Sequence, residues 1–215
     1  MIVSRIMTEN PFTIEPSTSV TDAQALMRRE KIHRLPVVDK HGALVGIVSE
    51  KDLLYASPSP ASTLNVYEMT NLLSKLKVET VMTRKPHTAN ANDTIEDAAR
   101  LMSDNNIGGL PVLNSAGKLV GIITESDIFR VFIDLFGIRK PGIRATFRIP
   151  ERPGEIADLG KEIGEAGGNI VSLGTWPGNA SDNSVCVIKV EGLSREAFLK
   201  AVEPSIIEVM DIRET

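Results

Sequence analysis

The stretch LVGIVSEKD (Leu44–Asp52) returns as LVGIITESD (Leu119–Asp127), 75 residues later in the chain. Sliding the sequence by that interval aligns Val3–Leu53 with Val78–Ile128 without a gap. Glycine, proline and aspartate residues stay in register with the apolar runs, and a chance similarity of composition would not preserve that register. The sequence therefore predicts two copies of one fold.

Composition limits the class of protein. Of the 215 residues, 42% are hydrophobic and 24% are charged, and no apolar run approaches the ~20 residues that cross a bilayer. The first residues lack the basic start and long apolar middle of a signal peptide. The single cysteine, Cys186, cannot form an intramolecular disulfide. We therefore expect a soluble protein of the cytoplasm with no membrane partner.

Each copy shows the same order of elements. Apolar residues at three- and four-residue spacing predict a helix that ends near Arg29. RLPVVD and LVGIVS then predict two strands joined by a turn at Gly42. The acidic residues from Glu50 onward suit the positive end of a second helix. Between the copies we expect a Pro/Ser loop, followed by a helix that leads into the second copy.

The chain after Lys140-Pro141-Gly142 follows a different pattern. IRATFRIP alternates as a strand, and RPGEIADLGKEIGEAG carries a helix with three apolar residues on one face. Two further strands, NIVSLGTWP and SVCVIKVEG, precede a helix in SREAFLKAVEP and a last strand in IIEVMDIRE. The order strand, helix, strand, strand, helix, strand is the ferredoxin-like arrangement.

Three motifs carry a family resemblance. Two copies each of h-M-T-x-x-P, h-x-x-L-P-V and G-h-h-[ST]-x-x-D, where h is hydrophobic, look like a tandem pair of CBS domains. The resemblance implies two repeats packed as one pseudo-twofold module, whose clefts often hold adenosine nucleotides or related ligands. RPGEIADLGKEIGEAGGNI resembles the first half of an ACT domain, a module that commonly binds amino acids or other small effectors and dimerises. Together the two parts resemble the acetoin-utilisation AcuB-type proteins of bacteria.

The predicted fold class is therefore α/β (α+β), with a CBS-domain pair of two sheet-plus-helix repeats followed by a ferredoxin-like βαββαβ ACT domain. We place the first CBS repeat at residues 1–60, a linker helix at 61–77, the second repeat at 78–138 and the ACT domain at 142–215.

The repeated motif ends at a strand-to-helix junction that suits a nucleoside. Asp52 and Asp127 each follow a hydroxyl residue by three positions, Ser49 and Thr124, and could accept hydrogen bonds from ribose hydroxyls. The helix N-terminus beside each carboxylate favours an anion. The alternative is that both carboxylates only cap their helices.

The string KIHRLPV in the first repeat offers an adjacent pair, His33 and Arg34, that can make charge-assisted hydrogen bonds to phosphate. It resembles the nucleotide-sensing γ subunit of AMP-activated protein kinase, in which the equivalent pair contacts phosphate. The second repeat has Gly108-Gly109 at this place. The alternative is that His33 and Arg34 belong to a solvated basic face.

The CBS resemblance implies two clefts, each combining the early strand and h-x-x-L-P segment of one repeat with the [ST]-x-x-D segment of the other. The first cleft is predicted to contain Thr8, Phe12, Thr13, Ile32, His33, Arg34, Pro36, Thr124, Ser126 and Asp127. The second is predicted to contain Thr83, His87, Thr88, Ile107, Gly108, Gly109, Pro111, Ser49, Lys51 and Asp52. We expect the first cleft to bind a phosphorylated nucleotide more tightly, because the second has Lys51 as its main cation.

The ACT resemblance implies an effector site at the turn before the first helix and at the strand that follows that helix. The residues carried over are Arg152, Pro153, Gly154, Asn169 and Ile170. The alternative is that this domain mainly joins subunits.

The sequence contains no recognisable catalytic set, because no nucleophile with its base, Walker phosphate loop or paired catalytic carboxylates appears. Three histidines and one cysteine lack ligand-like spacing, so no metal is expected, and a net charge of −4 argues against nucleic acid. We therefore expect a non-catalytic regulatory sensor that needs no cofactor and binds an adenine nucleotide (AMP, ADP, ATP or a related adenosyl ligand). Its expected partners are a second copy of the chain, an unidentified protein target and an amino acid or small effector at the ACT domain. The alternatives are a constitutive dimerisation scaffold with empty clefts and an unrecognised nucleotide-processing enzyme.

Overall fold

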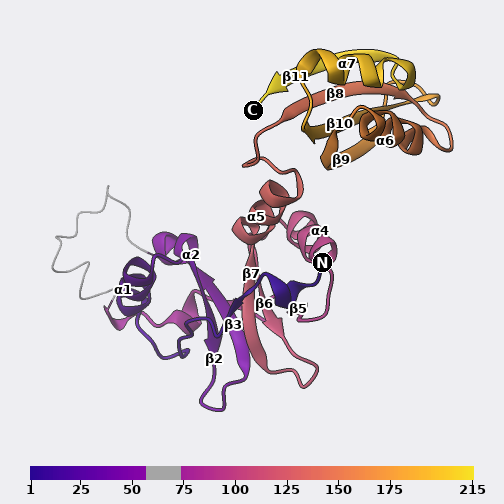
Figure 1. Cartoon of the computed structure of the whole chain (residues 1–215). Helices are drawn as coiled ribbons and strands as arrows, with labels where there is room; N and C mark the ends of the chain where they lie inside the picture. The colour runs from indigo at the N-terminus through magenta and orange to yellow at the C-terminus, as the bar shows by residue number, and fades with distance from the viewer. Residues whose placement is uncertain (57–73) are drawn as a thin grey trace. The chain divides into compact units, whose positions relative to one another are not determined.

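The computed structural model describes residues 1–56 and 74–215 and divides the chain into two units, Met1–Ile128 and Phe129–Thr215 (Figure 1). The expected Pro/Ser loop and most of the expected linker helix at 61–77 lie outside the described residues. Ser74 and Lys75, near the end of that expected helix, are helical.

The first unit contains the two predicted repeats, which have the same elements in the same order except for β5, whose counterpart in the first repeat is an isolated bridge between Ile14 and Val37. The first repeat has η1 (Val3–Arg5), β1 (Thr8–Glu9), α1 (Val20–Glu30), β2 (Arg34–Val38), β3 (Leu44–Ser49) and α2 (Glu50–Tyr55). The second has η2 (Val78–Thr80), β4 (Thr83–Arg84), β5 (Ala89–Asn90), α4 (Ile95–Asn105), β6 (Gly109–Leu113), β7 (Leu119–Thr124) and α5 (Glu125–Leu135). The duplicated pattern of helices and strands is confirmed.

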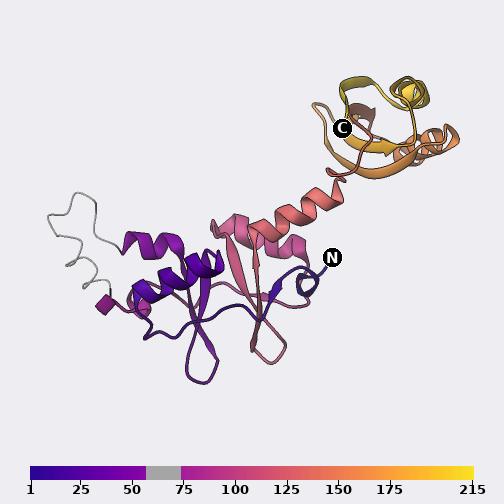
Figure 2. The ribbon, with the colours of Figure 1, turned by 60° about the vertical axis from the view of Figure 1, so that its left-hand side comes forward.

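Local chemistry explains where these elements begin and end. Ser19 caps α1 by accepting a hydrogen bond from the backbone N–H of Asp22 at 3.1 Å, and Thr94 caps α4 in the same way. The hairpins β2–β3 and β6–β7 turn at Gly42 and Gly117, whose φ angles of 81° and 74° favour glycine. Both views of the chain show the two hairpins side by side with their turns at the same end (Figures 1 and 2).

Each repeat completes the sheet of the other. Strand β1 belongs to the first repeat but pairs antiparallel with β7, and β4 belongs to the second repeat but pairs antiparallel with β3. The resulting strand orders are β1-β7-β6-β5 in one sheet and β2-β3-β4 in the other. The start of each repeat is therefore built into its neighbour.

The two hydrophobic cores are exchanged in the same way. Val3, from the start of the first repeat, is fully buried in the core of the second, among Met102, Leu110 and Ile123. Val78, its counterpart 75 residues later, is fully buried in the core of the first repeat. Because each core contains residues of both repeats, we expect neither repeat to form its complete core alone.

A glycine at each crossing point lets the exchanged strand approach. A Cβ built on Gly46 in β3 would lie 2.6 Å from Met82 Sδ and 3.0 Å from the carbonyl oxygen of Thr83. Gly121 in β7 faces Met7 and the Thr8 carbonyl in the equivalent way. The glycine of the repeated G-h-h-[ST]-x-x-D motif is therefore a packing position.

The second unit has the predicted ferredoxin-like order. Its elements are β8 (Ile143–Pro150), α6 (Glu155–Glu165), β9 (Asn169–Pro177), β10 (Asn183–Glu191), α7 (Arg195–Val202), η3 (Glu203–Ser205) and β11 (Glu208–Glu214). The strands form an antiparallel sheet in the order β11-β8-β10-β9. Helices α6 and α7 bury their apolar side chains in one core with β8 and β10, so both cover the same face of the sheet (Figure 1). Burial in that core raises the pKa of the Cys186 thiol to about 11.

The second unit begins inside α5 and not at residue 142, where the sequence placed the domain boundary. The segment after α5 packs on the sheet: the Phe136 carbonyl accepts a hydrogen bond from Ser172 Oγ at 3.2 Å. The Phe136 ring lies against Gly174, and Gly137 lies against Val171. These contacts with β9 explain why the end of α5 belongs with the C-terminal sheet.

The crossing at Gly46 generates a first prediction. Replacing Gly46 by alanine places a methyl group against a backbone carbonyl that is fixed by the β3–β4 pairing. We expect the variant to lose roughly 1–3 kcal/mol of unfolding free energy, as in other overpacked cores. Urea unfolding followed by circular dichroism measures this loss.

Gly164→Ala is the matched control, since a Cβ at this helical position meets no atom within 4 Å. That variant should keep the wild-type stability or gain roughly 0.4–1 kcal/mol. Equal unfolding midpoints for Gly46→Ala and the wild type would show that the crossing is not tightly packed.

Candidate functional site

A cleft of about 410 Å³ opens in the first unit, and residues of both repeats line it. The lining residues are His33, Arg34, Ile47, Ser49, Glu50, Lys51, Asp52, Thr83, Pro86, His87, Asn106, Ile107, Gly108 and Gly109. One wall is the junction of β3 and α2 together with the start of β2. The other wall is β4 with the loop after it and the segment between α4 and β6.

The exchanged strand β4 places the second wall beside the first. In the β3–β4 pairing, Thr83 lies opposite Ile47 and Arg84 lies opposite Gly46. Pro86 and His87 follow β4 directly and therefore reach the same cleft. The strand exchange that completes the sheet thus also assembles the cleft.

Asp52 fixes the start of α2 at one side of the cleft. Its Oδ2 accepts hydrogen bonds from the Ser49 N–H at 2.8 Å and from Ser49 Oγ at 2.7 Å. Ser49 Oγ in turn accepts from the Asp52 N–H at 3.2 Å, which completes a capping box. Asp127 accepts the same two hydrogen bonds from Thr124 at the start of α5 and is only 5% exposed. The capping role considered for both carboxylates is therefore present.

His33 is held against the start of α2. Its ring Nδ1 lies 2.7 Å from Glu50 Oε2, and the Glu50 N–H donates to the His33 carbonyl at 2.9 Å. In the second repeat the Glu125 N–H donates to the Gly108 carbonyl, but no imidazole is present there. The two repeats therefore share a backbone contact and differ in the charge beside it.

Arg34 crosses to the other repeat. Its guanidinium and Cδ lie against Gly108 and Gly109, in space that a Cβ at either glycine would enter. Glu125 Oε2 borders the same space, 2.6 Å from the place of a Gly108 Cβ. The two glycines at the position equivalent to His33-Arg34 thus leave room for the arginine of the first repeat.

The lining combines apolar and basic side chains. Ile47, Pro86 and Ile107 supply apolar surface, whereas the basic side chains are those of His33, Arg34, Lys51 and His87. Lys51 also stacks over the Tyr55 ring, with its Nζ 5.6 Å from the ring centroid. Such a lining suits a ligand with an apolar ring, hydroxyl groups and an anionic end.

Most residues predicted for the second cleft line this one cavity. The exceptions are Thr88, which precedes β5, and Pro111, which is buried in β6 opposite Ile122. The prediction missed Ile47, Glu50, Pro86 and Asn106. Each of these is one or two positions from a predicted residue, so extending the motifs that far would have found them.

His33 and Arg34, which were predicted for the first cleft, both line the second cleft with Lys51. The reason is the free space at Gly108-Gly109, which accepts the long arginine side chain. Pro36, also predicted for the first cleft, is buried in β2 opposite Ile47.

The remaining residues predicted for the first cleft occupy several environments. Thr8 pairs with Ile122 in β7, and Phe12 and Thr13 are exposed after β1. Ile32 packs against the first core, while Thr124, Ser126 and Asp127 lie at the start of α5. Thr8, Thr124 and Asp127 are thus near the β1–β7 pairing, as the pseudosymmetry requires.

The residues predicted for an effector site in the second unit are not brought together. Arg152, Pro153 and Gly154 line a shallow hollow of about 380 Å³ at the start of α6, and Arg152 is paired with Asp158 at 2.8 Å. Asn169 and Ile170 begin β9, at the other end of the eleven-residue helix α6. That helix is roughly 16 Å long at 1.5 Å per residue. Within one chain, helix α6 therefore separates the two halves of the predicted site.

Within the described ranges 1–56 and 74–215, no group of three or more His, Cys, Asp or Glu side chains is arranged to hold a metal ion. In the same ranges, no helix has the length and apolar character needed to span a bilayer.

The sequence profile of the CBS domain matches residues 3–59 and 78–134, which are more than half of the chain. The chain belongs to the CBS domain family. The two matched segments correspond to the two repeats, and the cleft lies between residues of both.

Three solved CBS structures are similar to this chain. CBSX2 of Arabidopsis thaliana, solved with AMP, is 35% identical, with 65% of this chain and 98% of that one covered and a TM-score of 0.52. The CBS pair of protein MJ0100, solved with 5-methylthioadenosine and S-adenosyl-L-methionine, is 31% identical with the same coverage and TM-score. A putative acetoin utilization protein (AcuB) from Vibrio cholerae is 31% identical over 65% of this chain and 95% of its own, with a TM-score of 0.53.

The capping geometry generates a second prediction. Asp52→Ala and Asp127→Ala each remove the acceptor of two hydrogen bonds at a helix start. We expect each variant to lose about 1 kcal/mol of unfolding free energy in the absence of any ligand, as for other lost caps. Chemical unfolding of the purified variants measures this loss.

The control is Asp104→Ala, at an exposed position in the last turn of α4. An acidic residue there opposes the helix dipole, so its removal should leave stability unchanged or slightly higher. If both cap variants unfold with the wild-type free energy, the two carboxylates do not stabilise their helices and the capping interpretation is wrong.

Proposed function

We propose that this protein is a non-catalytic regulatory sensor that binds an adenine nucleotide or a related adenosyl ligand in the cleft between its CBS repeats. The observation that carries the proposal is the convergence of His33, Arg34, Lys51 and His87 on one cleft with an apolar wall and a carboxylate. The AMP complex of CBSX2 and the adenosyl complexes of the MJ0100 pair support the class of ligand.

Each part of such a ligand has a chemically suitable group in the cleft. The base is assigned to the apolar surface between Ile47 and Ile107, which come from different repeats. The ribose hydroxyls are assigned to Asp52, whose Oδ2 already binds Ser49 and whose second oxygen is the acceptor offered to the ligand. The phosphate is assigned to Lys51 and Arg34 through charge-assisted hydrogen bonds.

This assignment reverses the order of the two clefts. The sequence placed the stronger phosphate site in the first cleft because of His33 and Arg34. With both residues in the lining of the second cleft, the cations are concentrated there. We therefore propose the second cleft as the tighter nucleotide site.

A ligand in this cleft touches both repeats and can therefore regulate how they pack. The ligand shifts a conformational equilibrium only if it binds one arrangement of the repeats more tightly than the other. The change would be read by another protein, because a sensor without catalytic residues acts through a target.

A homodimer is part of the proposal. Leu54 on α2 is 62% exposed and its counterpart Phe129 on α5 is 66% exposed, beside the exposed Tyr55. Large apolar side chains that recur at equivalent exposed positions are typical of surfaces covered by a partner. Light scattering on the purified protein tests this point: a mass near 46.8 kDa, twice the 23.4 kDa of one chain, is expected, and a mass of 23.4 kDa would remove the dimer.

The second unit is proposed to be an ACT domain that adds a second signal from an amino acid or another small effector. The ferredoxin-like order and the RPGEIADLGKEIGEAGGNI segment support this proposal. Since α6 separates the two halves of the predicted effector site in one chain, an amino acid would need a second subunit to contact both halves.

A further prediction concerns the phosphate cations. Calorimetric titration with AMP, ADP, ATP and S-adenosylmethionine should show binding to the wild type. Arg34→Ala and Lys51→Ala should each weaken the nucleotide by roughly 10- to 100-fold, because each removes a charge-assisted hydrogen bond. Arg28→Ala and Lys40→Ala, which remove the same charges at exposed positions outside the cleft, should bind like the wild type.

Other outcomes of the titration would support a different binding site or a different function. A loss for Arg34→Ala with none for Lys51→Ala would place the phosphate beside Arg34 and away from Lys51. No binding of any adenosyl ligand would favour the scaffold, and heat from amino acids alone would favour a signal through the second unit. Product formation from ATP that Asp127→Ala abolishes would show an enzyme.

A further inference from the structure

The C-terminal sheet has one face that α6 and α7 do not cover, here called the open face. Ile143, Ala145 and Phe147 of β8 pack into the core beneath the helices, so the alternate residues Arg144 and Thr146 point to the open face. Cross-strand partners share a face of a sheet. Lys189 of β10 pairs with Arg144, so its side chain also belongs to the open face.

Lys189 is a shielded cation. Only 3% of the residue is exposed, and its other cross-strand neighbour is Ser172 on β9. The segment after α5 covers this place, because Ser172 Oγ donates to the Phe136 carbonyl and Lys189 Cδ lies 3.9 Å from the position of a Gly137 Cβ. The ammonium group is therefore largely withdrawn from water.

No described residue neutralises this charge. The ammonium group of Lys189 makes no hydrogen bond or ion pair with any residue in the ranges 1–56 and 74–215, although its backbone belongs to the β10 ladder. Its directly opposite neighbour Arg144 carries the same charge, and like charges in that position destabilise a sheet. An ammonium that is buried without a counter-charge is strongly unfavourable.

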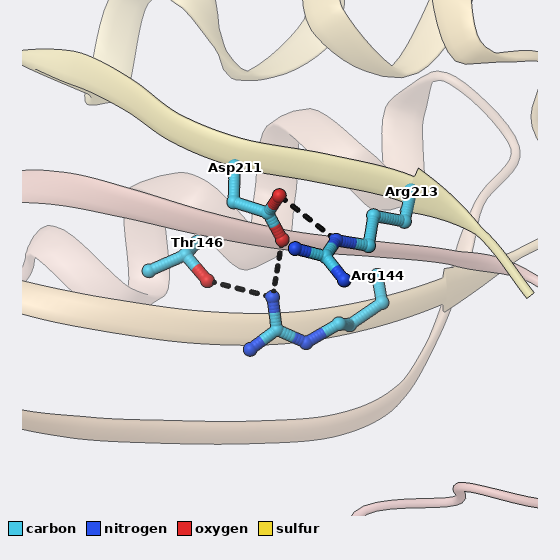
Figure 3. A network of polar contacts seen from close by, with 4 residues as sticks. All are labelled: Arg144, Thr146, Asp211 and Arg213. Carbon is cyan, nitrogen blue, oxygen red and sulfur yellow. Dashed lines mark hydrogen bonds and ion pairs between the residues drawn. The ribbon is translucent and has the colours of Figure 1, made fainter.

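The open-face carboxylates Asp211 and Glu191 have other partners. Asp211 of β11 accepts from Arg144 Nη1 at 2.8 Å and from Arg213 Nε at 2.9 Å, so the Arg144 guanidinium is drawn toward β11 (Figure 3). Arg144 Nη1 also donates to Thr146 Oγ1 at 2.9 Å. Glu191, two residues after Lys189 on β10, accepts from Asn169 Nδ2 at 2.7 Å. Among the described residues, Lys189 on the central strand β10 is thus left without a carboxylate partner, whereas Arg144 and Arg148 of β8 are paired with Asp211 and Glu208.

We propose that Lys189 is the centre of an anion-binding site on the open face of the C-terminal sheet. The site takes a small oxyanion, the carboxylate of a metabolite or a phosphate, which accepts hydrogen bonds from the Lys189 ammonium and lies beside the Ser172 hydroxyl. The narrow exposure limits the bound part to a group of that size. This site differs from the hollow at Arg152–Gly154 and from the CBS cleft, so it stands independently of the nucleotide proposal.

The open face offers a specific readout, because the only tryptophan of the chain, Trp176, lies on β9. Thermal unfolding followed by Trp176 fluorescence reports on this unit and not on the CBS cleft. Titration with inorganic phosphate or sodium acetate, at constant ionic strength set with sodium chloride, should raise the melting temperature with saturation. An anion bound only by the folded unit at 100 times its dissociation constant shifts this transition by several degrees.

Lys189→Met keeps the length of the side chain and removes its charge, and it should weaken the anion by at least about 10-fold. Lys200→Met is the matched control, at an exposed position on α7 over the other face of the sheet, and should respond like the wild type. Saturation by phosphate alone identifies a phosphoryl group as the occupant, and saturation by acetate alone identifies a carboxylate. Either result supports the site if the saturable rise in melting temperature is lost in Lys189→Met.

The wild-type titration keeps the proposal testable even if Lys189→Met does not fold. A rise that is linear and not saturable is the general stabilisation given by excluded salts, and it would overturn the site. An undiminished saturable rise in Lys189→Met, or in Lys189→Gln if the methionine variant is unfolded, would place the anion elsewhere and also overturn it.

Discussion

The exchange of strands β1 and β4 between the repeats is the constraint on which the rest of the first unit depends. Each short strand pairs with the sheet of the other repeat, and each places a valine, Val3 or Val78, in the other core. This arrangement requires a glycine at the crossing, because any Cβ at Gly46 would meet the backbone of the incoming strand. The duplication is therefore stable as a pair, since neither copy contains its own complete sheet and core.

The same exchange gives the cleft its chemistry. By pairing Thr83 with Ile47, strand β4 puts a wall from the second repeat beside the capped start of α2 in the first. The pseudosymmetry is broken at several positions of the lining: the first repeat has His33-Arg34 and Lys51 where the second has Gly108-Gly109 and Ser126, and the second has His87 where the first has Phe12. Arg34 occupies the space that the glycines leave, so its charge lies in the same cleft as Lys51 and His87. A charge-bearing ligand would distinguish the two clefts for this reason.

Sequence reasoning succeeded for features that depend on residues a few positions apart. The helix that ends near Arg29, the turn at Gly42 and the alternation in β8 were all readable, because each is decided by the local spacing of residues or by a local φ angle. It did not predict the position of a side chain or segment that packs against residues far away in the sequence. Arg34 lines the same cleft as Lys51, and the segment after α5 packs on the C-terminal sheet, where the Phe136 carbonyl accepts a hydrogen bond from Ser172 on β9.

Repeats, caps, turns and the order of strands and helices can thus be read from the chain, since these follow from covalent geometry and from the spacing of apolar residues. The folded structure alone decides which strand completes which sheet. It also decides where the Arg34 guanidinium lies and that the Lys189 ammonium has no carboxylate partner among the described residues. Pairings such as β3 with β4, and the burial of Lys189 beneath the segment after α5, join residues that are far apart in the chain. The surroundings of a charge are set by all the elements that meet around it, and their meeting is a property of the tertiary fold.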